Sequence, residues 1–241
     1  MLTALAWAYL IYLDRQMASS TAYETMMAEM GMAMAGSWTL SDAFFTFLMW
    51  AVMMVGMMAG SATPVLLLFG AARAGRGKPA VSADVLMFGL GYVTVWIAFS
   101  VCAALAQWGL HQKLLLSADM SLASPRVAGA ILAAAGIYQL TPLKGTCLAQ
   151  CQSPLGFLMS HWRDGIPGAL QMGARHGVFC LGCCWVLMCV LFAVGVMNLF
   201  WVAALALFVL LEKIGPAGPL VPRISGVLMI GYGLFVAFPK S

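Results

Sequence analysis

Five of the seven cysteines in this chain lie between residues 147 and 184. Cys147 and Cys151 are four residues apart, so a helical turn would place both thiols on one face. A second group follows further along the chain and consists of His176, Cys180, Cys183 and Cys184. Thiolate and imidazole are ligands of soft and borderline metal ions, which favours Cu(I), with Zn(II) as the alternative.

A second interpretation of the cysteines is packing, because a free cysteine is a small apolar side chain that helices use at close contacts. Cys183 and Cys184 also stand beside Gly182, which is typical of such contacts. The pairing of an apolar cysteine group with CLAQC in a polar segment favours a metal or redox function. Cys102 and Cys189 stand alone in apolar segments and are predicted to serve packing only.

Methionine provides a second signal, since 11 of the 19 methionines fall between residues 17 and 58. Thioethers are soft ligands that suit the capture of Cu(I). The first group lies in an acidic segment and includes Met30, Met32 and Met34. The second group has helical spacing in an apolar segment and includes Met53, Met54, Met57 and Met58. Methionine also fills irregular gaps in cores, and for the second group this is the better interpretation.

These residues must be positioned by apolar helices, because 63% of the chain is hydrophobic and only 8% is charged. A soluble domain carries about 25% charged residues. The composition therefore excludes a soluble enzyme, a nucleic-acid-binding protein and a disordered chain, and predicts an all-α, polytopic transmembrane helix bundle. No catalytic motif or pair of carboxylates is recognisable, so an enzyme is not the favoured class.

The charged residues divide the chain into one integral membrane domain, residues 1–241, with seven predicted spans. They are residues 1–13, 43–70, 85–108, 126–142, 177–195, 198–212 and 222–238, with a tight turn at 195–198. The first is short for a span of about 20 residues, and we expect it to begin upstream of Met1. Residues 14–42 form a methionine-rich outer loop. Residues 143–175 form a cysteine-containing inner loop, in which we expect short interfacial helices.

Loop charges predict the orientation. Residues 71–84, 143–175 and 213–223 carry 8 of the 12 lysines and arginines. The positive-inside rule places these loops in the cytoplasm, with the N-terminus inside and the C-terminus outside. The cysteine groups would then face a reducing compartment. Glu212 and Lys213 are interpreted as an ion pair at the membrane boundary.

Four segments carry a resemblance to a known family: residues 49–64, 136–154, 173–192 and 197–213. They include MWAVMMVGMMAGSATP, KGTCLAQCQSP and GARHGVFCLGCCW. The chain resembles an uncharacterised bacterial family of predicted metal-binding integral membrane proteins, over nearly its whole length from about residue 38. The resemblance implies an inner-membrane helix bundle with metal ligands at the cysteine and histidine positions named above. Gln152 and Gly60 depart from the family pattern.

Three functions remain open at this stage. The leading hypothesis is a membrane protein that binds Cu(I) for transport or for delivery to a cuproenzyme. The second is an accessory subunit of a larger membrane complex, in which small residues and methionines serve packing. The third is a membrane thiol-disulfide oxidoreductase, although the predicted cytoplasmic location of the cysteines argues against it. The lipid bilayer is the expected environment, and no nucleic-acid partner is expected.

Overall fold

Helices account for nearly all of the chain that the structure describes. The computed structural model describes residues 3–13, 15–16, 40–77, 83–112, 124–196, 198–215 and 220–238, and no strand occurs within these ranges. This confirms the predicted all-α class. After the short helix Thr3–Leu13, the elements are α2 (Leu40–Ala74), α3 (Ala83–Gln112), α4 (Pro125–Gln139), α5 (Pro142–Gln152), α6 (Pro154–His161), α7 (Gly165–Val194), α8 (Leu199–Ile214) and α9 (Leu220–Ala237).

Four helices are long and apolar enough to cross a membrane, namely α2, α3, α7 and α9. The pair α4 and α5 passes the same test together, with a bend of 65° between them, and gives a fifth candidate. The sequence predicted seven spans. The remaining two of the seven, Thr3–Leu13 and α8 with its 16 residues, are shorter than about 17 residues, the lower limit for a helix that spans a bilayer.

The segment predicted as the inner loop, residues 143–175, is mostly helical. It contains most of α5, all of α6 and the first turns of α7, which begins at Gly165 and not at residue 177. Local sequence explains these starts, since Thr141 caps α5 through its hydroxyl and a proline occupies the first turn of both α5 and α6. The predicted turn at 195–198 is present: Gly195 ends α7 at φ +100° and Asn198 caps α8.

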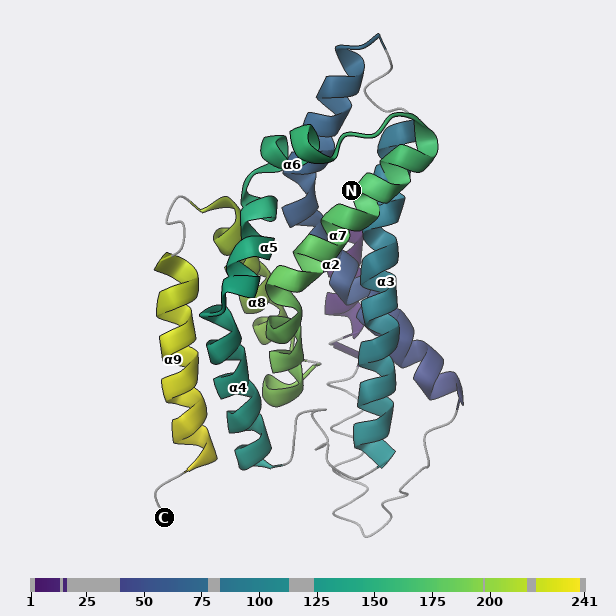
Figure 1. Cartoon of the computed structure of the whole chain (residues 1–241). Coiled ribbons are helices and arrows are strands. Elements are labelled where there is room, and N and C mark those ends of the chain that lie inside the picture. The colour runs from purple at the N-terminus through teal and green to yellow at the C-terminus, as the bar shows by residue number, and fades with distance from the viewer. Residues whose placement is uncertain are drawn as a thin grey trace.

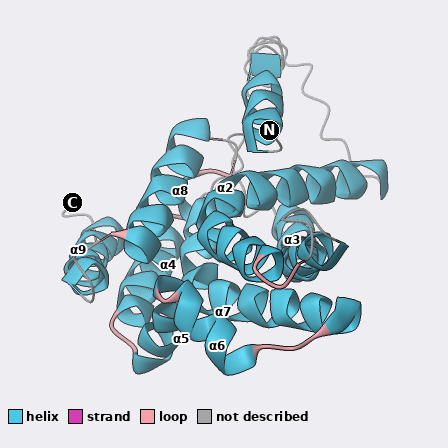
Figure 2. Ribbon diagram, turned by 90° about the horizontal axis from the view of Figure 1, so that it is seen from above, coloured by secondary structure: helices cyan, strands magenta, loops and turns pink. Residues whose placement is uncertain are grey.

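Glycines allow two pairs of helices to approach closely. A side chain at Gly91 of α3 would collide with the Leu170 carbonyl of α7, and one at Gly173 of α7 would collide with the Phe88 carbonyl of α3. Glycines serve the same purpose between α4 and α9, which run side by side at one edge of the molecule (Figure 1). Helix α7 contacts α3, α4, α5 and α8 and so joins the parts of the bundle. Figure 2 shows it from above, with α3 alongside it.

The main hydrophobic core lies where α2, α3, α5, α7 and α8 meet, and it contains the cysteines of α7. Two bases that the sequence interpretation counted as loop charges lie inside this region. Lys144 is 1% exposed and Lys213 is 5% exposed. The prediction that both residues lie in loops is therefore wrong. Each lysine stands just after an apolar run that was taken as a complete span, but both positions are helical.

Candidate metal centre

The cysteines of α7 face the interior of the molecule. Cys180, Cys183 and Cys184 are each 1% exposed. Their spacing of three and four residues places them on one face of the helix. The thiols of Cys183 and Cys184 both donate to the Cys180 carbonyl at 3.0 Å. These three thiols therefore form a buried group within a single turn.

Helix α5 brings a fourth thiol to this group. Cys151 is buried in the same core cluster as Cys180, Cys183 and Cys184, and it interacts electrostatically with Cys180 and Cys183. Cys147 lies one turn earlier on α5 and is half-buried, with its Sγ 2.7 Å from the point where a side chain at Gly182 would begin. The absent side chain at Gly182 thus lets α5 lie against α7. The two cysteine motifs meet in space, and we call Cys151, Cys180, Cys183 and Cys184 the thiol cluster.

Two thiols of the thiol cluster, those of Cys183 and Cys184, donate to the backbone carbonyl of Cys180. Among the residues that the structure describes, no three or more His, Cys, Asp or Glu side chains are arranged around a common point as metal ligands. A metal ion that enters the cluster must therefore displace thiol protons and draw the sulfurs toward itself.

Lys213, which was interpreted as the ion-pair partner of Glu212, and Tyr92 were not among the predicted site residues, yet both contact Cys180. The Lys213 ammonium donates to Cys180 Sγ at 2.9 Å and to Ser61 Oγ at 3.3 Å, and its Nζ lies 3.9 Å from Met58 Sδ. The Tyr92 hydroxyl lies 3.0 Å from the same Cys180 sulfur. Side chains from α3 and α8 therefore meet at one sulfur of α7, and two side chains of α2 contact Lys213 beside it.

The predicted ion pair between Glu212 and Lys213 is wrong. Glu212 instead pairs with Lys144 at 2.7 Å, and both side chains are almost fully buried. The Lys144 ammonium also donates to the Gln139 side chain, whose amide nitrogen donates to Glu212 at 3.1 Å. Neighbouring residues of a helix do not face each other, so Glu212 and Lys213 meet different partners.

His176 lies one turn before Cys180 on α7 and is 2% exposed. Its ring contacts the edge of Phe157 at a centroid distance of 4.8 Å and the ring of Tyr92 at 5.9 Å. Its Nδ1 is buried and has no hydrogen-bond partner among the described residues. A buried nitrogen without a hydrogen-bond partner lowers the stability of the fold unless a ligand binds it. The Nδ1 atom of His176 is therefore available to bind a metal ion or a proton.

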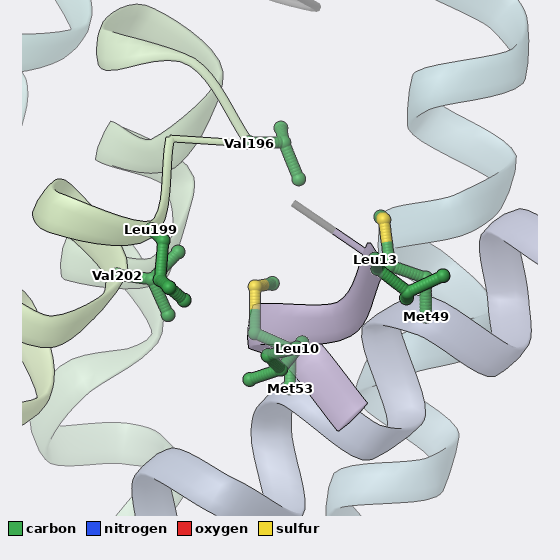
Figure 3. A pocket seen from close by; sticks show the side chains of 7 residues that line it. All are labelled: Leu10, Leu13, Met49, Met53, Val196, Leu199 and Val202. Atoms are coloured by element: carbon green, nitrogen blue, oxygen red, sulfur yellow. The ribbon is translucent and has the colours of Figure 1, made fainter. Parts of the chain in front are cut away.

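The methionines divide into different environments. Met53, Met54, Met57 and Met58 of α2 are all buried, as is Met49. Figure 3 shows Met49 and Met53 lining a small apolar pocket with Leu10, Leu13, Val196, Leu199 and Val202. This environment supports packing for these two. Met58 lies near the thiol cluster, since its sulfur is 3.9 Å from the Lys213 ammonium. The loop methionines Met30, Met32 and Met34 lie outside the described residues.

Comparison with known protein families gives a match. The model of the PpoB2 family, described as a copper chaperone, matches residues 47–236. This range includes every helix from α3 to α8, together with most of α2 and α9. No match was found among curated proteins or solved structures.

Proposed function

Since the chain belongs to the PpoB2 copper chaperone family, we propose that it holds Cu(I) at the thiol cluster while embedded in a membrane and delivers it to a cuproenzyme. The observation that carries this proposal is the position of Cys180 Sγ, which contacts the Lys213 ammonium at 2.9 Å and the Tyr92 hydroxyl at 3.0 Å in the core cluster that also holds Cys151.

The charge of Lys213 supports a thiolate ligand at Cys180. A buried ammonium requires a nearby negative charge or a full set of polar partners. The contacts of Lys213 in the described structure are a thiol, a hydroxyl and a thioether. Of these three groups, only the thiol readily becomes an anion. Cu(I) bound to a pair of thiolates carries one negative charge, which the ammonium neutralises.

The form of the cluster favours Cu(I) over Zn(II). Structural zinc sites use four ligands in a tetrahedron, and the described residues contain no such arrangement. Soft thiolate and thioether ligands select Cu(I). Each metal–sulfur bond replaces a bond from sulfur to hydrogen, so we expect copper affinity to fall as pH decreases.

A membrane location is supported by apolar residues on the outer surfaces of the candidate spans. Leu86 on α3, Leu228 on α9 and Phe235 on α9 are among the large apolar side chains that remain exposed. Such a surface suits contact with lipid tails. The ion pair between Arg76 and Asp164 at 3.4 Å brings the end of α2 to the start of α7. We propose that this basic end faces the cytoplasm of the bacterial inner membrane.

The test is Cu(I) binding by protein purified without oxygen, measured by competition with a chromophoric Cu(I) chelator. Cys180→Ser is nearly isosteric, and its hydroxyl can still accept from Lys213, so we expect the fold to persist. The variant should bind Cu(I) at least about a hundredfold more weakly than the wild type. Loss of a group that only hydrogen-bonds to a metal ligand usually weakens metal binding by less than this.

Cys102→Ser is the matched control, because Cys102 is an exposed residue of α3. It should bind Cu(I) with wild-type affinity. Equal affinities of the two variants, or failure of the wild type to retain Cu(I), would contradict the proposal and leave the cysteines as packing residues.

A further inference from the structure

A polar pocket lies at the corner where α6 meets α7, outside the thiol cluster. His161, Arg163, Met172 and Arg175 contribute to its lining. Two of these side chains, His161 and Met172, are of the types that bind Cu(I). The other two are guanidinium groups, which attract anions and repel free cations. This combination of soft ligands and positive charge has no role in the site already described.

The hydrogen bonds of His161 leave one of its nitrogens available. Its Nδ1 lies 3.1 Å from the Phe157 carbonyl, and a carbonyl can only accept. Nδ1 therefore carries the hydrogen, and Ser160 Oγ, 2.9 Å away, can accept from it because the Ser160 hydroxyl donates to the Gly156 carbonyl at 2.8 Å. The lone pair of Nε2 is thus left for a ligand.

Helix α7 links this pocket to the thiol cluster through soft ligands at successive turns. Met172, His176 and Cys180 are spaced four residues apart, a rise of about 6 Å per step. All three are buried. Met172 lines the pocket, and its sulfur accepts the backbone N–H of Arg163 at 3.1 Å. The middle position is His176, whose Nδ1 has no partner in the described part of the chain.

Phe157 closes the more direct route between the two imidazoles. Its buried ring stacks on His161 at a centroid distance of 4.9 Å and meets His176 edge-on at 4.8 Å. A copper ion that leaves the pocket can therefore pass along α7, where Met172, His176 and Cys180 offer ligands at successive turns.

We propose that this pocket is the loading site for Cu(I), which arrives as a complex with a small anionic thiol and moves along Met172 and His176 to Cys180. The inference rests on the proposed function. Arg163 and Arg175 attract the anionic complex, whereas they would repel free Cu⁺. The transfer is ligand exchange without oxidation. Each bond from copper to a donor thiolate breaks as a bond to a protein ligand forms, and each departing donor thiolate takes the proton that one cysteine of the thiol cluster loses on binding copper.

The experiment measures loading rates of the full-length protein in detergent, by anaerobic stopped-flow absorbance. Two probes are used, the anionic complex of Cu(I) with glutathione and the cationic complex of Cu(I) with acetonitrile. In the double variant Arg163→Gln/Arg175→Gln, loading from the glutathione complex should slow by about tenfold, the lower range for loss of electrostatic attraction. Loading from the acetonitrile complex should not slow.

Met172→Leu should slow loading from both probes while the equilibrium affinity for Cu(I) stays at the wild-type value. Arg126→Gln, which removes an exposed arginine in the first turn of α4, is the matched control and should load normally. Wild-type rates in the arginine and Met172 variants would overturn the loading site while leaving the proposed function intact. Failure of the wild type to retain Cu(I) from either probe would instead overturn the proposed function itself.

Discussion

Two buried lysines, Lys144 on α5 and Lys213 on α8, have partners of different chemistry. The Lys144 ammonium contacts both carboxylate oxygens of Glu212, at 2.7 and 2.9 Å, and the side chain of Gln139. The Lys213 ammonium contacts a thiol, a hydroxyl and a thioether. The first charge is neutralised by a residue that is anionic under ordinary conditions, whereas the second depends on ionisation of Cys180 or on a ligand.

The difference between the partners of the two lysines distinguishes a contact that stabilises the fold from a contact that belongs to the candidate metal site. Glu212 and Lys213 are neighbours on α8, and each faces a different part of the interior. Glu212 ties α8 to α5 through Lys144, and its backbone carbonyl also accepts from Gln152 at 2.8 Å. Lys213 instead directs a positive charge at the thiol cluster. We infer that the Lys144 pair supports the fold and that Lys213 supports copper binding.

The largest expected effect comes from breaking the Lys144 pair. Lys144→Met should lower the free energy of unfolding by about 3–5 kcal/mol, because it leaves the Glu212 carboxylate buried without a counter-charge. Thermal unfolding in detergent, followed by circular dichroism, measures this loss. The protein that remains folded should still bind Cu(I), since Lys144 does not contact the thiol cluster.

A second substitution sharpens this prediction. In Lys144→Met/Glu212→Leu both charges are removed, and most of the lost stability should return, because apolar replacement of a buried ion pair is often neutral or stabilising. Arg126→Met removes an exposed base and should leave the unfolding temperature unchanged. If the double variant is as unstable as the single variant, packing around Lys144 matters more than its charge.

Much of the fold could be predicted from composition and from the spacing of charged residues. Long apolar runs gave the cores of α2, α3 and α7, and the turn at Gly195 followed from a run too long for one span. The helical nature of α5 was missed because KGTCLAQCQ is polar. Thr141 followed by Pro142 is a recognisable helix start and is the signal that could have identified α5.

The site could be predicted only in part. Its cysteines belong to motifs that are visible in the sequence, whereas the position of the Lys213 ammonium depends on contacts between distant helices. The cysteine spacing indicated that Cys151 and Cys180 could meet. Nothing local marks Tyr92 as a partner of Cys180, which is 88 residues away. For Lys213 a signal existed, since adjacent helical residues do not face each other and Glu212 could not be its partner.

The second prediction concerns Lys213. Lys213→Met should weaken Cu(I) binding by about tenfold to a hundredfold, the range for loss of a group that supports metal ligands. Without copper, the free energy of unfolding should change by about 1 kcal/mol or less, because the partners of Lys213 can remain neutral and keep other hydrogen bonds. Chelator competition and thermal unfolding of the same preparation measure both quantities.

Lys213→Met is thus expected to lose copper affinity and keep its stability, whereas Lys144→Met is expected to lose stability and still bind copper. The distinction between the two lysines depends on these opposite results. A loss of stability in Lys213→Met as large as in Lys144→Met would show that both lysines support the fold. Unchanged copper affinity in Lys213→Met would remove the ammonium from the site and leave the thiols as the only groups that determine binding.

The smallest effect is expected for Tyr92→Phe, which removes one hydroxyl beside Cys180. The lost contact of 3.0 Å should weaken Cu(I) binding by roughly fivefold, the equivalent of one hydrogen bond of about 1 kcal/mol. The Tyr92 hydroxyl also donates to the Met58 carbonyl at 3.3 Å, and this bond is lost as well. The Met58 carbonyl still accepts from the Ser61 hydroxyl at 2.9 Å, so stability should change little. Tyr138→Phe is the matched control, because the Tyr138 hydroxyl donates to the Gly182 carbonyl of α7 and does not contact Cys180. A loss in Tyr92→Phe that exceeds the loss in Lys213→Met would identify the phenol oxygen as a ligand, and the charge of Lys213 would then no longer be the main difference between the two lysines.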